Sequence, residues 1–225
     1  TSKTFLLYGG IAISGKVNSD LRVSWTLPRT LGAEWEEGGL DLSPRSEKVR
    51  VYDINRDDSF GSDAYRDWGE AVAQGAQFQD INGDGLYDPN VDQPEIIGDR
   101  TLWFVMNDST TTDRWFSTKS MGVEAHVTAW AYDDEDFLGD VVFMRYRLLN
   151  KSQDQIDSVY FSKYADTDIG DFEDDLVGCS PIRNLVFSYN DGNDSGYGSD
   201  PPAVGIVLLQ GPVVDSPGNT ASLFR

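Results

Sequence analysis

A strict alternation of residue types over positions 123–132 is the feature that most constrains the fold of this chain. Val123, Ala125, Val127 and Ala129 occupy every second position, with polar or aromatic residues between them. A repeat of two places alternate side chains on opposite faces of a β-strand, whereas an amphipathic helix requires a repeat of 3.6. We therefore predict a strand here, with one face of small apolar residues.

The same period of two recurs along the chain, and a helical period is weak everywhere. Residues 142–148 and 158–162 alternate in the same way, and the connections before each of them carry turn residues such as Asp, Gly and Asn. We expect these two segments and 123–132 to be consecutive antiparallel strands. Further strands are predicted at Phe5–Ser14, Leu21–Trp25, Lys48–Ile54, Thr101–Met106, Asn184–Tyr189 and Ala203–Leu209.

Helical structure is expected only at Asp63–Gln74, for one or two turns, because Gly69 is a weak helix former. Long connections rich in Gly, Asp and Asn span about 55–100 and 166–202, and loops of that length are usually functional or held by something else. The predicted fold is mainly β: an antiparallel β-sandwich with long acidic, calcium-stabilised loops. We expect a single β-rich domain over 1–225 that is a fragment of a larger multi-domain exoprotein.

The charge of the chain excludes two classes of partner. It has 18 basic and 38 acidic side chains, a formal net charge of -20, which repels nucleic acid and anionic membrane surfaces. With 39% hydrophobic and 12% aromatic residues, the acidity belongs to a folded protein rather than a disordered one. No stretch approaches the roughly 20 apolar residues of a membrane span, so direct membrane insertion is not expected.

The chain has one Cys and one His, which limits its chemistry. No internal disulfide, thiolate metal cluster or multi-histidine site can form. His126 lies in the predicted strand between Glu124 and Thr128, and we expect a surface or packing residue rather than a general base. Cys179 follows an acidic loop that disfavours a reactive thiolate, and we expect it to be small and buried. No catalytic residue is predicted.

Any metal must therefore be bound by oxygen, and one segment has the spacing of a calcium loop. Alternate residues of such a loop wrap the ion with side-chain oxygens and one backbone carbonyl, and a glycine at the sixth position permits the sharp turn. In this chain Gly85 takes the sixth position. The ligands expected at the first, third, fifth, seventh and ninth positions are Asp80, Asn82, Asp84, the Leu86 carbonyl and Asp88.

The segment departs from a helix–loop–helix calcium site at its end. The twelfth position is Val91, so closure has to come from Asp92 or from Glu95. No amphipathic helix flanks the loop, which favours a free-standing calcium loop between strands. The alternative is an ordinary turn with solvated acids, because Asp, Asn and Gly are also common turn residues.

Other acidic segments fit either an ion site or an acidic surface. These segments are 133–136, 166–175 and 190–194, while Asp53–Asp58 is better explained as a polar strand end. Glycoside hydrolysis needs two carboxylates at a defined separation, and nothing selects two from so many. Trp103, Trp115 and Trp130 either stack on sugars or belong to the core.

Several segments of the chain resemble those of one protein family. The stretch from Gly75 to Asn107, which includes the sequence DINGDGLYDP at Asp80–Pro89, resembles a family of large secreted surface proteins of Bacteroidota and their relatives. Further similar segments are Tyr8–Gly15, Leu21–Ser24, Asp168–Asp171, Asp174–Cys179 and Gly196–Gly198. The resemblance implies a β-rich, multi-domain exoprotein that commonly leaves the cell by type IX secretion.

Two functions remain open on this basis. The first is a non-catalytic structural or adhesive module of an extracellular or cell-surface protein or assembly, stabilised by calcium, with other subunits or further domains of the parent chain as partners. The alternative is a carbohydrate-binding or carbohydrate-active module that uses exposed Trp and Asp residues on glycans.

Overall fold

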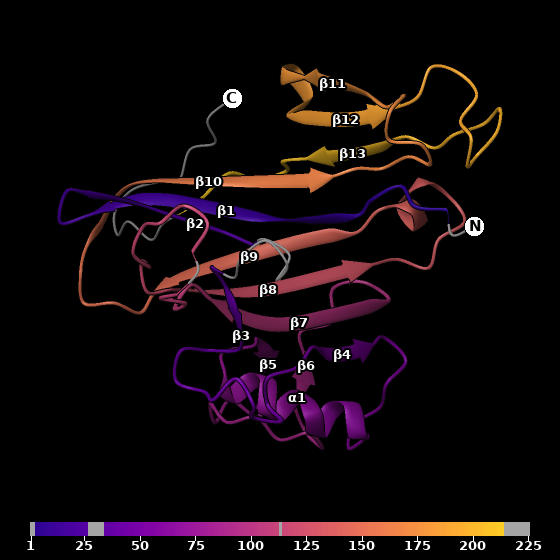
Figure 1. Cartoon of the computed structure of the whole chain (residues 1–225). Helices are drawn as coiled ribbons and strands as arrows, with labels where there is room; N and C mark the ends of the chain where they lie inside the picture. Colours follow the sequence, from indigo (N-terminus) through magenta and orange to yellow (C-terminus); the bar gives the residue numbers. More distant parts are fainter. Residues whose placement is uncertain (1–2, 27–33, 113, 214–225) are drawn as a thin grey trace. The chain divides into compact units, whose positions relative to one another are not determined.

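The computed structural model describes residues 3–26, 34–112 and 114–213, which form several antiparallel sheets and one short α-helix (Figure 1). The expectation of a mainly β chain is therefore confirmed. The chain divides into two compact units, one of residues 14–159 and one of residues 1–13 with 160–225.

The larger unit contains a five-stranded sheet in the order β3-β7-β8-β9, with β4 also paired to β7. All of its pairings are antiparallel, and the alternating strands predicted at 123–132 and 142–148 are neighbours in it. Arg100 lies opposite Ala131, and Val123 lies opposite Asn150. The strands are β3 (Glu36–Glu37), β4 (Tyr52–Asn55), β7 (Arg100–Asn107), β8 (Val123–Ala131) and β9 (Phe143–Asn150).

Strand β8 is buried on both faces, although its sequence alternates between apolar and polar. Val127 is fully buried, and His126 and Thr128 on the opposite face are about as inaccessible, at 5% and 4% exposure. That opposite face also carries Trp103 and Val105, which lie opposite Thr128 and His126 in the register. The polar face of β8 is therefore part of the interior.

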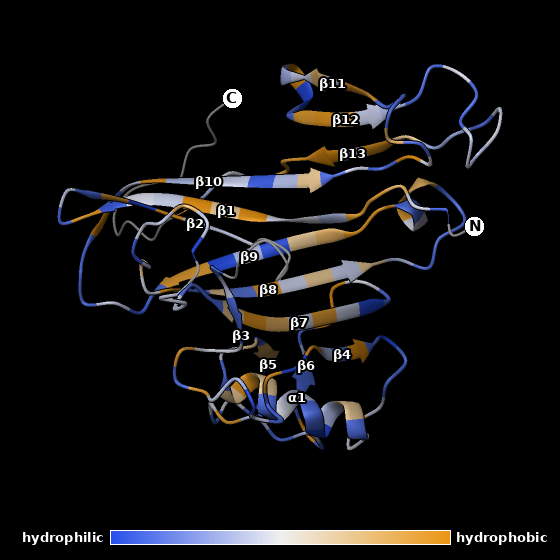
Figure 2. Cartoon of the chain, in the orientation of Figure 1, coloured by the Kyte–Doolittle hydropathy of each residue, from blue (hydrophilic) through white to orange (hydrophobic). Residues whose placement is uncertain are grey.

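Helix α1 (Asp63–Ala73) is longer than the one or two turns expected. Ser62 caps its first turn by accepting a hydrogen bond from the Tyr65 amide, and Tyr65, Trp68 and Ala71 are its buried residues. Their spacing of three places them on one face, and burial of that face outweighs the low propensity of the glycine. The helix therefore has a buried apolar face, and its other residues include hydrophilic ones (Figure 2).

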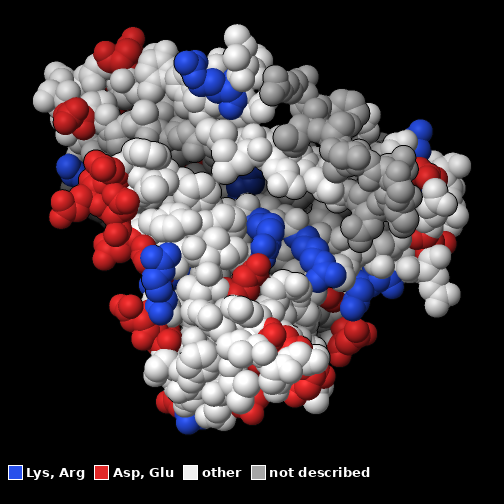
Figure 3. Space-filling view, turned by 180° about the vertical axis from the view of Figure 1, so that it is seen from behind, with Lys and Arg blue, Asp and Glu red and all other residues white. Residues whose placement is uncertain are grey.

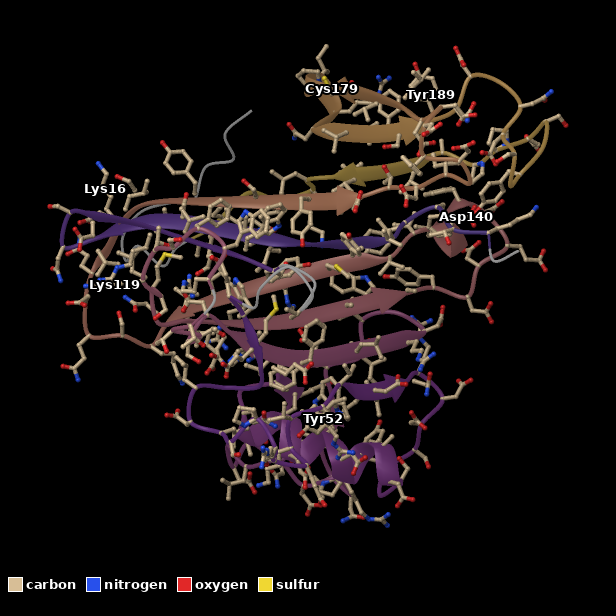
Figure 4. All side chains as sticks on the ribbon, in the orientation of Figure 1. Lys16, Tyr52, Lys119, Asp140, Cys179 and Tyr189 are labelled. Atoms are coloured by element: carbon tan, nitrogen blue, oxygen red, sulfur yellow. The ribbon has the colours of Figure 1, made fainter. Side chains whose placement is uncertain are left out.

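The buried face of α1 packs on the same core as β4 and β7. Trp68 and Ala71 belong to one cluster with Tyr52, Ile54 and Trp103. Figure 4 shows Tyr52 on the side of β4 that faces α1, where its hydroxyl donates to the Lys48 carbonyl (2.9 Å). No helix in the described parts of the chain is long and apolar enough to cross a membrane.

The connection predicted over about 55–100 contains secondary structure of its own. Besides α1 it includes β5 (Phe78–Gln79) and β6 (Gln93–Pro94), which pair antiparallel as a two-stranded sheet. Residues 80–92, the predicted calcium loop, connect these two strands. The expectation that the loop lies between strands is therefore confirmed.

The third predicted strand of the alternating series has a different partner from the one expected. It forms part of β10 (Ile156–Asp166), which belongs to a three-stranded sheet in the order β10-β1-β2 with β1 (Tyr8–Val17) and β2 (Asp20–Trp25). The prediction that it would follow β9 in the same sheet is wrong. Alternation indicates a strand but carries no information about which edge that strand joins.

The smaller unit contains an antiparallel sheet in the order β11-β12-β13. Its strands are β11 (Leu176–Ser180), β12 (Leu185–Tyr189) and β13 (Val204–Val207). Much of β12 and β13 is hydrophobic (Figure 2), yet Val186 on β12 is 50% exposed. Val177 on β11 is 79% exposed. Cys179 is exposed as well, so the expectation that it would be buried is wrong. Its strand is an edge strand whose outward side chains have little to pack against.

Candidate functional site

The predicted calcium loop is a compact turn organised by its first residue. The two carboxylate oxygens of Asp80 accept hydrogen bonds from the amides of Gly83 and Gly85, at 2.7 Å each. Both glycines have positive φ, 76° and 77°, a conformation that favours residues without a side chain. Gly85 therefore provides the sharp turn expected at the sixth position.

In the middle of the loop, two side chains each accept a hydrogen bond from the backbone amide two residues later. Asn82 Oδ1 accepts from the Asp84 amide (3.1 Å), and Asp84 Oδ1 accepts from the Leu86 amide (2.8 Å). All three side chains are exposed, and that of Leu86 is 72% exposed. Since a carboxylate has about four acceptor positions, Asp80 and Asp84 keep some of theirs available to another partner.

Asp92 closes the loop. Its side chain is fully buried, and its two oxygens accept from the amides of Ile81 (2.9 Å) and Asp88 (2.8 Å). One carboxylate thus links the first and last parts of the turn. Glu95, the other residue considered for closure, instead forms an ion pair with Arg145 on β9. The role of Asp92 as a metal ligand stays a prediction.

The loop is anchored to the core of the larger unit through Tyr87. Its hydroxyl donates to the Tyr65 carbonyl of α1 (2.8 Å), and its ring meets that of Phe78 edge-on at 5.3 Å. Burial raises the pKa of Tyr87, with the nearby groups Tyr65 and Asp92 adding to the shift. Tyr87 therefore connects the loop to the core as a partly buried side chain packed against it.

The donor types and their order fit a calcium ion, but the carboxylates do not converge on one point. In residues 3–26, 34–112 and 114–213, no three His, Cys, Asp or Glu side chains form a group that could hold a metal. The side chains of Asp80, Asp84 and Asp88 instead accept backbone amides. Calcium binding would require these three carboxylates to turn toward a common centre.

A buried acid–histidine pair lies in β8, which the alternating sequence did not predict. His126 Nε2 lies 2.8 Å from Glu124 Oε1, and the Leu40 amide donates to Glu124 Oε2 at 2.9 Å. Lys151 Nζ is 3.7 Å from Glu124 Oε1. Burial by itself raises the pKa of Glu124, but the contacts with His126, Leu40 and Lys151 outweigh it and hold the pKa below its usual value.

This pair has the surroundings of a packing element rather than of a catalytic base. His126 meets the Trp103 ring edge-on at 5.4 Å, and Gly75 packs directly against the imidazole. Glu124 and His126 are 4% and 5% exposed, so neither is open to a substrate. The sequence could have indicated the pair only through its i, i+2 spacing on one strand face.

In the smaller unit, four carboxylates from two distant segments come together. Those from 166–175 and 190–194 are Asp171, Asp174, Asp175 and Asp194. Desolvation and the charges of its neighbours raise the pKa of Asp174. Desolvation acts in the same direction on Asp194, but the amides of Asp171, Tyr197 and Gly196 donate to that carboxylate and lower its pKa overall. The cluster is an acidic loop structure held by backbone amides.

The three tryptophans considered for sugar stacking differ in exposure. Trp103 is only 3% exposed and belongs to the core, as expected for a strand aromatic. Trp130 is half-buried, and its ring stacks on that of Phe143 at 5.5 Å with an interplanar angle of 8°. Trp115 is 54% exposed. No common sugar platform is formed by Trp103 and Trp130.

Acidic and basic side chains are mixed over the visible surface, as Figure 3 shows, with Lys and Arg in a row across the middle and Asp and Glu around them. Several arginines are paired with acids, among them Arg50 with Asp67 (3.1 Å) and Arg100 with Asp53. The pair formed by Asp53 agrees with the explanation of its segment as a polar strand end. These exposed pairs each contribute little to stability, because solvent and salt screen them.

Comparison with known proteins adds no relative: no family model, no curated protein and no solved structure matches the chain.

Proposed function

We propose that this chain is a non-catalytic structural or adhesive module of an extracellular surface protein or assembly, with a β-sandwich core and loops that calcium stabilises. The observation that carries the proposal is the turn at residues 80–92. Its ligand-type side chains follow calcium-loop spacing, and Gly85 has the positive φ that the sixth position needs.

The placement of the loop supports a structural rather than a regulatory use of the ion. Tyr87 ties the loop to α1, and the buried Asp92 holds its two ends together. No flanking helix pair is present in the described residues around the loop that could open in response to calcium. An ion bound here would stabilise the folded unit as a whole.

The alternative, a carbohydrate-binding or carbohydrate-active module, has less support from the strand aromatics. Trp103 is buried, and Trp130 is engaged with Phe143. A catalytic version would need two accessible carboxylates at a defined separation, while the most perturbed acid of the larger unit, Glu124, is buried. The structural function is therefore better supported than a sugar site built on these strand tryptophans or a catalytic site built on Glu124.

The experiment that tests the proposal is thermal unfolding with calcium, with magnesium and with a chelator. Extracellular calcium modules bind at about 0.1–1 mM, and a ligand at about 100 times its dissociation constant adds about 2.7 kcal/mol of stability. We expect a higher Tm with calcium than with chelator, and a smaller gain with magnesium, which demands a tighter octahedral site.

A matched pair of variants shows whether the gain arises in the loop. Asp84→Ala removes an expected ligand and should abolish the calcium-dependent rise in Tm. Asp157→Ala removes an exposed acid that accepts a hydrogen bond from the Gln155 side chain, outside the loop and outside the other acidic segments, and should retain the full rise. Equal melting of the wild type in calcium and in chelator, or a full calcium gain in Asp84→Ala, would contradict the assignment.

A further inference from the structure

A hollow on the larger unit gathers cations, which is unusual in a chain of net charge -20. Its volume is about 640 Å³, and its described lining residues are Arg22, Arg114, Lys119 and four residues with hydroxyl side chains. A smaller hollow of about 240 Å³ shares Arg22 and Lys119 and adds Asp20. Among the residues that the structure describes, the charged side chains that line the larger hollow are therefore all cationic.

Arg114 serves as the framework of this hollow. Its Nη1 donates to the carbonyls of Thr110 (3.0 Å) and Asp108 (3.2 Å), and its Nη2 donates to the Val23 carbonyl (2.9 Å). The nearby Asp108 carboxylate is buried and accepts from the Val123 amide and from others, so it is not presented to the hollow. Arg114 thus fixes the loop after residue 113 against β2.

Arg22 and Lys119 supply the charge that remains available. Arg22 Nη1 donates to the Ser120 carbonyl at 2.6 Å, which holds the guanidinium in place, while its Nε is buried without a hydrogen-bond partner. Lys119 is exposed, and neither residue has an ion pair with any described part of the chain. The Nη2 group of Arg22 and the ammonium group of Lys119 can donate to the oxygens of a carboxylate or sulfate.

We propose that this hollow binds the oxyanion group, carboxylate or sulfate, of an anionic saccharide. The volume lies in the range of small-molecule sites and exceeds what a lone ion fills. The lining hydroxyls, including those of Ser117 and Thr111, suit a ligand rich in hydroxyl groups.

The net charge of the protein does not prevent such binding. At physiological ionic strength charges are screened beyond about 8 Å, so a short anionic ligand responds mainly to the cations that line the hollow. A long polyanion would also contact the acidic surface, so each of its charges would contribute less to the binding free energy. The site therefore favours short or terminal anionic sugars, and binding should weaken as salt is added.

The proposal is tested by calorimetric titration of the whole chain in calcium-free Tris-chloride buffer, so that the outcome does not depend on the calcium loop. The probes are a uronic acid tetrasaccharide, a sulfated tetrasaccharide, neutral cellotetraose and inorganic sulfate. We expect one or both of the anionic tetrasaccharides to bind, and cellotetraose and inorganic sulfate to bind at least about tenfold more weakly. Which anionic tetrasaccharide binds identifies the oxyanion.

Two lysines of the larger unit give a matched pair of charge reversals, and both are labelled in Figure 4. Lys119→Glu, in the hollow, should lower the affinity by about tenfold or more, as expected for loss of one charged contact. Lys16→Glu, exposed on β1 and outside both hollows, should change it by less than about twofold. Circular dichroism of both variants checks that they are folded.

Four results would overturn the proposal. These are no binding of either anionic tetrasaccharide at millimolar concentration, equal binding of cellotetraose, binding of inorganic sulfate as tight as that of the saccharides, and equal losses in Lys119→Glu and Lys16→Glu. The last result would assign the binding to general electrostatics rather than to the hollow.

Discussion

His126 Nε2 lies 2.8 Å from Glu124 Oε1 on one face of β8, with both side chains inside the larger unit. The pair satisfies polar groups that the sheet would otherwise bury without partners, since Glu124 also accepts from the Leu40 amide. It therefore links the centre of the sheet to the segment that precedes β4. The contribution of the pair to the stability of the protein, and the change of that contribution with pH, can both be measured.

Removing the carboxylate should destabilise the larger unit. Glu124→Ala leaves the Leu40 amide and His126 without their acceptor in the interior, which costs about 1–3 kcal/mol for a buried unsatisfied group. Urea unfolding followed by tryptophan fluorescence measures the change. Glu135→Ala, at an exposed acid, is the control and should stay within about 0.5 kcal/mol of the wild type. Equal stabilities for the two variants would contradict a structural role for the pair.

The same carboxylate should make the protein sensitive to acid. Its pKa is lowered in the folded state, so its contribution is fully present above the unfolded value of about 4.3 and is lost as the pH falls through the folded pKa. We expect the free energy of unfolding of Glu124→Gln to fall less steeply below about pH 4.3 than that of the wild type. Parallel pH profiles for the two proteins would exclude this contribution.

Gly85 should be sensitive to substitution for conformational reasons alone. A Cβ at this position meets nothing within 4 Å, but the φ of 77° is strained for residues with a side chain. Gly85→Ala should therefore cost about 1 kcal/mol. Gly85→Asn should cost less, because Asn tolerates the left-handed region. Chemical denaturation in a chelator measures both; equal losses would indicate that something other than φ decides the effect.

Cys179 should react readily in the native protein, because it is exposed on β11. A maleimide reagent should label Cys179 to the same final extent with and without urea. Mass spectrometry measures the labelled fraction. Cys179→Ser should leave the free energy of unfolding within about 0.5 kcal/mol of the wild type. Labelling that requires urea would show that the thiol is covered in solution.

Several elements of the fold could be predicted from the pattern of residues along the chain. The period of two located β8 and β9 and their antiparallel pairing, and the turn residues between β5 and β6 located the loop at 80–92. These features are local, because side-chain direction in a strand and the glycine conformation in a turn depend on neighbours along the chain. Whether the loop binds calcium is not a local property of this kind and stays a prediction.

Other features depended on contacts between distant residues. No periodicity could show that β10 pairs with β1, that the polar face of β8 is covered and encloses Glu124 and His126, or that Cys179 faces outward. The hollow between Arg22 and Lys119 likewise joins segments nearly a hundred residues apart. Alternation shows which side chains share a face of a strand. Whether that face is buried depends on the elements that pack on it, because burial is set by what lies across from a residue and not by its neighbours in the chain.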